Sequence, residues 1–274
     1  QDYSSAASDV YKRQIIYCGD TMRYTAICDF DGTLTGATGR LTDTTAAKIK
    51  EFMKENKLCI ASYTDLAKLE EIRRKHSLAC DLFSFSSAAG ILNQSGWYLP
   101  MPAGIVRQLL TEFDSFIYTA YAVSLNQVYI IHYQSRLELF YPAGERKIVS
   151  SIDAPIPGIT IALSKEAFKN LCFFLQETGL SYQLLASDRN RDILFISAKP
   201  PKRELVSHLK KLYPDTTTVG IGDSQIDYEF IQYCDIKIAM KNAEEELKKL
   251  CDKTTMLENT EDGCMTELMR LYNS

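Results

Sequence analysis

Apolar and polar residues follow one another along the first part of the chain in a pattern that predicts alternating strands and helices. A β-prone run at 24–28 precedes a segment, 43–56, whose apolar residues repeat on one helical face. A second apolar run at 58–61 is followed by a helix that Asp65 begins. This order is typical of a parallel sheet whose strands are joined by helices.

The end of the chain repeats this order. Residues 202–212 have the apolar period of a helix, and 217–221 and 236–239 have the composition of strands. Asn242 is expected to cap a further helix, with Glu245 three residues later. We therefore predict an α/β fold built on a doubly wound, Rossmann-like parallel sheet.

The middle of the chain has a different pattern, in which strands are grouped around two helices. The strands are expected in a hairpin at 90–99 and at 128–133, 137–141, 182–186 and 193–197, and the helices at 103–116 and 165–178. Such a grouping is typical of a small α+β unit. We expect residues 22–84 and 190–274 to form an α/β core that is interrupted by an α+β insert at 85–189.

Residues 1–21 are polar, have no sustained period and lack the apolar segment of a secretory signal. We expect them to be a non-native or disordered leader, with Met22 as the native start. No stretch approaches the ~18 consecutive apolar residues of a membrane-spanning helix. The sequence therefore predicts no membrane association.

Composition and charge exclude several classes of protein. Lys and Arg total 31 against 35 Asp and Glu, and this net charge of −4 provides no basic field for a nucleic-acid partner. The 8 cysteines include no C-x-x-C pair and most lie in apolar runs, so we expect free thiols and a cytoplasmic location. We expect a monomer or a small homo-oligomer.

The first strand ends abruptly in D-F-D-G-T, which places Asp29 and Asp31 in a loop at the carboxyl edge of the sheet. One carboxylate of such a pair can attack a substrate while the other moves protons. Because two close carboxylates repel each other, a hard divalent cation such as Mg²⁺ suits the site. An acidic surface turn is the alternative for this segment alone.

Four motifs together resemble those of the haloacid dehalogenase superfamily. D-F-D-G-T-L-T at 29–35 is similar to its first motif, Ser62 stands at the place of the second, and Lys202 at that of the third. G-D-S-Q-I-D at 222–227 matches the acidic fourth motif, G-D-x-x-x-D. The run I-A-M-K-N-A at 238–243 is similar to one in the Cof-like branch, subclass IIB, whose large cap is inserted between the second and third motifs.

The resemblance implies a phosphatase with defined catalytic roles. Asp29 would be the nucleophile that forms an aspartyl-phosphate, and Asp31 would protonate the leaving oxygen and then activate water. Ser62 and Lys202 would bind the oxygens of the transferring phosphoryl group. The substrates implied are small phosphorylated metabolites of the sugar-phosphate type.

The resemblance also implies a Mg²⁺ site. Asp223 would bind the ion together with Asp29 and the backbone carbonyl of Asp31, and Asp227 would support these ligands. In the cap, Arg189 and Arg191 could contact the far end of an anionic substrate, although a solvated charged turn is the alternative.

Three segments depart from the family pattern. Ser62-Tyr63-Thr64 stands where T-G-R is frequent, Ile226 where Asn often precedes the last aspartate, and 86–90 where E-N-G is frequent. Two alternatives therefore remain beside the phosphatase: a phosphomutase of the phosphomannomutase type and a catalytically weak binding protein on the same fold.

Overall fold

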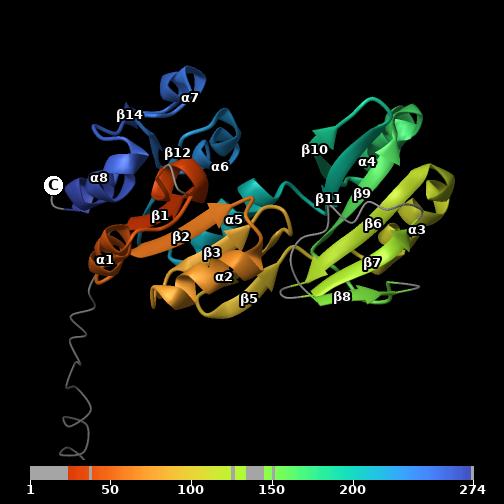
Figure 1. The fold of residues 1–274 in the computed structure, drawn as a ribbon, viewed down its shortest axis with the longest axis horizontal. Helices are drawn as coiled ribbons and strands as arrows, with labels where there is room; N and C mark the ends of the chain where they lie inside the picture. The colour runs from red at the N-terminus through yellow and green to blue at the C-terminus, as the bar shows by residue number, and fades with distance from the viewer. Residues whose placement is uncertain (1–23, 37–38, 125–126, 134–144, 150–151, 273–274) are drawn as a thin grey trace, which may run out of the picture.

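The computed structural model describes residues 24–36, 39–124, 127–133, 145–149 and 152–272. Two sheets, each with its own apolar core, organise these residues (Figure 1). The larger sheet consists, in spatial order, of β14 (Lys253–Thr254), β13 (Ile236–Ala239), β12 (Thr217–Gly222), β1 (Tyr24–Cys28), β2 (Lys57–Ser62), β3 (Asp81–Ser84), β4 (Ala89–Leu92) and β5 (Ser95–Tyr98). The expected leader, 1–21, and Met22 lie outside the described residues.

The larger sheet is doubly wound, as the sequence predicts. The chain adds β2 and β3 on one side of β1 and β12, β13 and β14 on the other, all parallel. Its helices are α1 (Asp43–Phe52), α2 (Leu66–Lys75), α5 (Pro201–Leu212), α6 (Tyr228–Ile231), α7 (Glu245–Leu250) and α8 (Gly263–Tyr272). Successive strands are thus added first on one side of β1 and then on the other, which makes β1 a topological switch point. In α/β sheets, ligands bind at the carboxyl ends of the strands next to such a point.

The smaller sheet belongs to the inserted α+β unit, which we call the cap. In spatial order it consists of β10 (Ser181–Ser187), β11 (Arg191–Ser197), β9 (Gly158–Ser164), β6 (Ile117–Ser124), β7 (Gln127–Tyr133) and β8 (Glu145–Ile148). Helices α3 (Ala103–Glu112) and α4 (Phe168–Thr178) bury apolar residues such as Leu109 and Leu171 with Ile161 and Leu194 of the sheet. Alternate residues of β10 and β11, among them Gln183 and Phe195, point to the opposite face.

The limits of the insert differ from those expected. We placed strands β4 and β5 in the insert by starting it at residue 85, but β4 pairs with β3 of the larger sheet and β5 pairs with β4. Strand β11, which we placed in the core by ending the insert at 189, lies between β10 and β9 of the cap sheet. A hydrophobic pattern predicts that two strands form a hairpin, but it does not show which sheet the hairpin joins. The limits at 85 and 189 were wrong for this reason.

Inside the cap the sequence pattern missed three strands, β6, β8 and β9. The strand expected at 137–141 lies outside the described residues. In the larger sheet, α1 ends earlier than expected because the buried Asn56 accepts a hydrogen bond from Tyr24 N (3.0 Å) and donates one to Phe52 O (3.0 Å). No described helix combines the length and apolar character that a bilayer crossing requires. The described cysteines are all free thiols.

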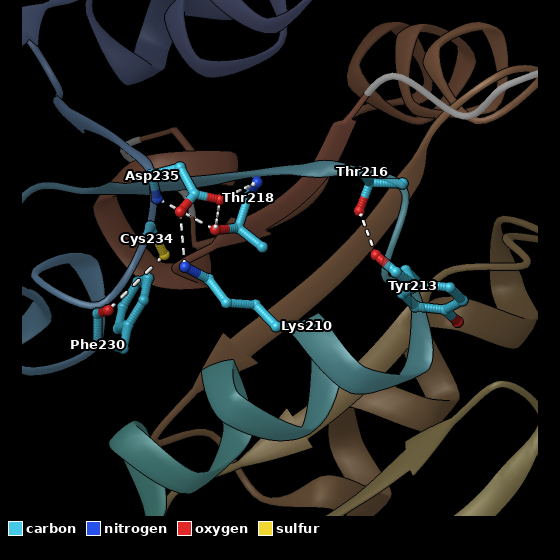
Figure 2. Close-up of polar contacts among 7 residues, drawn as sticks. All are labelled: Lys210, Tyr213, Thr216, Thr218, Phe230, Cys234 and Asp235. Carbon is cyan, nitrogen blue, oxygen red and sulfur yellow. Dashed lines mark hydrogen bonds and ion pairs between the residues drawn. The ribbon is translucent and has the colours of Figure 1, made fainter.

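Asp235 anchors the start of β13 to the neighbouring strand β12 (Figure 2). Its Oδ2 accepts hydrogen bonds from Thr218 N (2.9 Å) and Thr218 Oγ1 (2.7 Å), and Lys210 Nζ on α5 lies 2.6 Å from its Oδ1. Burial alone would raise the pKa of Asp235, but the hydrogen bonds from Lys210 and Thr218 outweigh it and lower the pKa. The carboxylate therefore fixes the register of β12 and β13 at the edge opposite their carboxyl ends.

Asp235→Ala should lower the free energy of unfolding by about 1–3 kcal/mol, because the fully buried Thr218 N–H loses its side-chain acceptor. Since the folded pKa lies below the unfolded one, this contribution should be complete above the usual Asp pKa and disappear as the pH falls below it. Lys210→Met is the matched control: it removes only a half-exposed ion pair and should cost at most about 1 kcal/mol. Equal losses from both variants in urea unfolding would contradict this assignment.

Candidate active site

The candidate site lies at the carboxyl ends of β1 and β12, which are adjacent parallel strands. Asp29 follows β1, and its backbone N–H donates to Ile221 O of β12 at 3.0 Å. Asp223 follows β12 directly. Parallel pairing thus delivers the first and fourth sequence motifs to one place, as the sequence predicts.

Three carboxylates form the centre of the site. Asp29, Asp223 and Asp227 each offer an oxygen atom, and these atoms all lie within 4.8 Å of one another. Asp227 is held by three donors to its Oδ2: the backbone N of Asp223 (3.1 Å), the backbone N of Ser224 (3.0 Å) and Ser224 Oγ (2.9 Å). Thr33 Oγ1 donates to Asp223 Oδ1 at 3.1 Å. The backbone and two hydroxyls therefore hold the carboxylates together against their mutual repulsion.

The electrostatics of this cluster favour a cation. Burial, followed by the charge of Asp227, raises the pKa of Asp29 well above its usual value. Burial and then Asp227 also raise the pKa of Asp223, to about 6, and burial raises that of Asp227. Three crowded oxygen donors of this kind fit a hard divalent ion such as Mg²⁺, because its charge removes their repulsion.

A single wide turn, η1 (Phe30–Leu34), follows Asp29, and its glycine brings the two motifs together. Gly32 has φ +84°, and a methyl group there would lie 2.8 Å from Cγ of Asp223. Asn242 Nδ2 donates to Gly32 O at 2.9 Å and so holds the turn from the far side. Glycine is required here both for its left-handed backbone and for the close approach of Asp223.

Asp31 is exposed beside the cluster and is not one of its three carboxylates. Its Oδ2 accepts a hydrogen bond from Thr64 Oγ1 at 2.8 Å. Ser62 ends β2, and its Oγ accepts from Thr64 N at 3.0 Å, which fixes the loop that carries Thr64. Thr64 thus orients Asp31, and the structure brings Ser62 to the same edge of the sheet.

Lys202, in the first turn of α5, is 3% exposed. Its Nζ donates to Ile226 O at 2.5 Å, lies 3.4 Å from Glu229 Oε2, and sits 4.8 Å from the ring centre of Tyr63. Burial lowers the pKa of the Lys202 ammonium, and the charges of Glu229, Asp227 and Asp29 oppose that shift. A buried ammonium in the field of the aspartates is placed to stabilise negative charge that develops beside them.

A hydrogen bond connects this site to the cap. Gln183 Nε2 on β10 donates to Tyr63 Oη, in the loop between Ser62 and Thr64. The Tyr63 ring also packs on Phe85, with ring centres 5.5 Å apart. Tyr63, which stands where the family often has glycine, is therefore in contact with both the lysine and the cap.

The structure does not bring the two cap arginines to the aspartates. Arg189 is exposed in the turn between β10 and β11, and Arg191 Nε is paired with Asp188 Oδ2 at 2.6 Å. In the β10–β11 hairpin Ser181 pairs with Ser197, next to the link to α5, while this turn lies at the other end. With a rise of ~3.3 Å per residue, six residues of β11 separate Arg191 from that link by roughly 20 Å.

Sequence reasoning missed four residues that shape the site: Thr33, Thr64, Asn242 and Glu229. Thr33 stands two residues after Asp31 and Thr64 two residues after Ser62, so the available signal was a hydroxyl close to a candidate site residue. Asn242 was expected to cap a helix, but α7 begins after Glu244 and Asn242 binds Gly32 O instead. No sequence pattern signalled Glu229.

Comparison with known proteins places the chain in a family. The model of the haloacid dehalogenase-like hydrolases matches residues 26–268, so the chain belongs to this family, and its fold and motifs are those of a Cof-like member. No curated protein gives a significant match.

Solved structures share the whole fold at low identity. A protein from Thermotoga maritima is 17% identical, with a TM-score of 0.72 over 91% of this chain and 97% of its own. A haloacid dehalogenase-like hydrolase from Bacteroides thetaiotaomicron is 19% identical, with a TM-score of 0.70 over 91% and 99%. A second protein from that organism, described among the phosphatases of the superfamily, is 18% identical, with a TM-score of 0.65 over 95% and 99%.

Proposed function

We propose that the protein is a Mg²⁺-dependent phosphatase that hydrolyses small phosphorylated metabolites through a phosphoryl group carried on Asp29. The observation that carries this proposal is the buried cluster of Asp29, Asp223 and Asp227 with Lys202 in its electrostatic field. The family match and the phosphatase among the similar structures support it.

In this mechanism the Asp29 carboxylate attacks phosphorus, and the ester oxygen leaves with a proton from Asp31. Asp31 then takes a proton from water, which attacks the phosphoryl group and regenerates Asp29. Lys202, with Ser62, stabilises the charge on the transferring oxygens. Asp29, Asp223 and Asp227 would hold Mg²⁺, which neutralises charge on the phosphoryl group when bound. We propose Asp31 as a ligand through its backbone carbonyl only.

The test is phosphate release from p-nitrophenyl phosphate with Mg²⁺ and with EDTA. We expect EDTA to abolish release and Mg²⁺ to restore it, while Asp223→Asn should raise the Mg²⁺ concentration needed for half-maximal rate by at least about tenfold. Release that is unaffected by EDTA would contradict the metal site. No release in either condition would favour the binding protein. Release of p-nitrophenol without inorganic phosphate, dependent on a sugar acceptor that takes the phosphoryl group, would favour the phosphomutase.

The Tyr63–Gln183 hydrogen bond should hold the cap against the core. Tyr63→Phe removes the hydroxyl that accepts this bond, and Gln183→Leu removes the amide that donates it. Each variant should therefore raise the KM for p-nitrophenyl phosphate about 2- to 10-fold with little change in kcat. The double variant should show no further loss, because both changes remove the same interaction. If the effects of the two substitutions on KM were additive in free energy, the two residues would act separately.

A further inference from the structure

A cavity of about 290 Å³ lies between the cap and the candidate active site. Gln183 and Ser197 line it from the cap, and Lys202 and Glu229 line it from the core. Because Lys202 is coupled electrostatically to Asp29, the cavity lies next to the place where a phosphoryl group would be transferred. Its role in binding rests on the proposed function, since the cavity would receive the part of the substrate that is not phosphate.

Positive charge in this cavity is confined to Lys202, the one cation among the described residues that line it. Of the three N–H donors of its ammonium, one binds Ile226 O at 2.5 Å, and Glu229 Oε2 lies 3.4 Å from Nζ. The remaining donor would bind the transferring phosphoryl oxygen. Arg189 and Arg191 lie at the other end of the β10–β11 hairpin, roughly 20 Å from the link to α5. A second anionic group on the substrate would therefore meet no further cation among these residues.

Glu229, on the short helix α6, places a negative charge at the same cavity. Its side chain is 59% exposed, and no described residue binds its Oε1. The Debye length at physiological ionic strength is about 8 Å, so salt does not remove the interaction between this carboxylate and a charge on a substrate that Lys202 holds. Since the phosphoryl oxygens would offset the charge of Lys202, Glu229 determines the sign of the field that acts on the organic part of the substrate.

We propose that Glu229 is a specificity-determining residue that selects substrates by charge. It favours phosphomonoesters whose organic part carries an amine or a hydroxyl and disfavours those that carry a second anionic group. A carboxylate accepts hydrogen bonds from an ammonium or a hydroxyl group, but it repels another carboxylate or a phosphate. A phosphomutase intermediate carries two phosphates, so the same charge disfavours that alternative.

Three phosphomonoesters of similar size test this selection: 2-aminoethyl phosphate, 2-hydroxyethyl phosphate and phosphoglycolate, whose organic parts are cationic, neutral and anionic. Glu229→Gln keeps the shape of the side chain and removes its charge. Relative to 2-hydroxyethyl phosphate, this variant should raise kcat/KM for phosphoglycolate about 3- to 10-fold and lower that for 2-aminoethyl phosphate by a similar factor. The effect is modest because solvent screens an exposed carboxylate. Each ester is compared between the variant and the wild type, so differences between the leaving groups cancel.

Glu245→Gln is the matched control. Glu245, on α7, is also an exposed glutamate paired with a lysine, Lys248 (2.9 Å), and it does not line the cavity. This control should leave the ratios among the three esters as they are in the wild type. Because Glu229 contacts Lys202, its substitution also acts on all three esters together. An equal change in all three would show that Glu229 acts only through Lys202, and it would overturn the proposal while leaving the proposed function intact.

If none of the esters were hydrolysed, the proposed function would fail, and calorimetric binding of two stable phosphonates would still decide this proposal. The wild type should prefer 3-hydroxypropylphosphonate over 3-phosphonopropionate by a ratio of affinities about 3- to 10-fold larger than that of Glu229→Gln. The same ratio in both proteins would refute the selection by charge.

Discussion

Asp29→Asn should abolish phosphate release, with a loss of at least about 10³-fold in kcat, because a neutral amide does not attack phosphorus. Asp31→Asn should lower kcat by ~10²–10⁴-fold, since it removes the proton transfers but leaves the nucleophile. Release of p-nitrophenol under saturating Mg²⁺ measures both. An Asp29→Asn variant that keeps more than about a tenth of the wild-type rate would contradict the assignment of the nucleophile.

Thermal stability in the absence of metal shows whether the Asp29→Asn variant is folded. The pKa of Asp29 is higher in the folded protein than in the unfolded chain, so above the usual Asp pKa the folded state binds more protons. Ionisation of Asp29 therefore destabilises the fold as the pH rises. In EDTA at neutral pH, Asp29→Asn should therefore melt at the same temperature as the wild type or higher. Wild-type stability should fall as the pH rises from about 4 to about 6, where Asp223 also ionises. A large drop in the melting temperature of the variant would show that its inactivity reflects misfolding.

Gly32→Ala should damage both stability and metal binding. Alanine at φ +84° costs ~1–2 kcal/mol, and its methyl group would be forced against the Asp223 carboxylate, which adds about 1–3 kcal/mol. The free energy of unfolding should thus fall by about 2–5 kcal/mol. Displacement of Asp223 should also weaken Mg²⁺ binding roughly 10- to 100-fold.

Gly39→Ala is the matched control for this change. Gly39 also has a positive φ, +62°, but a methyl group there meets no atom within 4 Å. It should cost only the ~1–2 kcal/mol of backbone strain and leave the Mg²⁺ requirement unchanged. Urea unfolding and Mg²⁺ titration of the two variants separate strain from the contact with Asp223, and the same Mg²⁺ requirement in both would contradict the role of Gly32.

The larger sheet and the centre of the site could be predicted because they depend on local patterns. An apolar run that ends in D-F-D-G places Asp29 at the carboxyl edge of β1, and a second run that ends in G-D places Asp223 at that of β12. Parallel pairing of these strands then suffices to bring both carboxylates together. The glycine of D-F-D-G is typical of a tight turn, but its positive φ and its close approach to Asp223 are visible only in the structure.

The remaining features depend on contacts between distant segments. The Gln183–Tyr63 hydrogen bond joins residues 120 positions apart, and Asn242 reaches Gly32 across 210 positions. Neither pairing leaves a periodic signal in the chain. Arg191 was expected at the substrate because of its charge, but its place is set by the length of β11 and by its pairing with Asp188. Sequence thus predicts which chemistry the site can carry better than it predicts which residues surround it.

The most direct test of the central claim is to trap the phosphoryl group on Asp29. The protein is mixed with p-nitrophenyl phosphate and Mg²⁺, quenched in acid during turnover, and reduced with borohydride, which converts an aspartyl-phosphate to homoserine. Mass spectrometry of the digested protein should then find homoserine at position 29 in the wild type, and none in Asp29→Asn or without Mg²⁺. Turnover without any modification at Asp29, or with modification at another residue, would contradict the proposed mechanism.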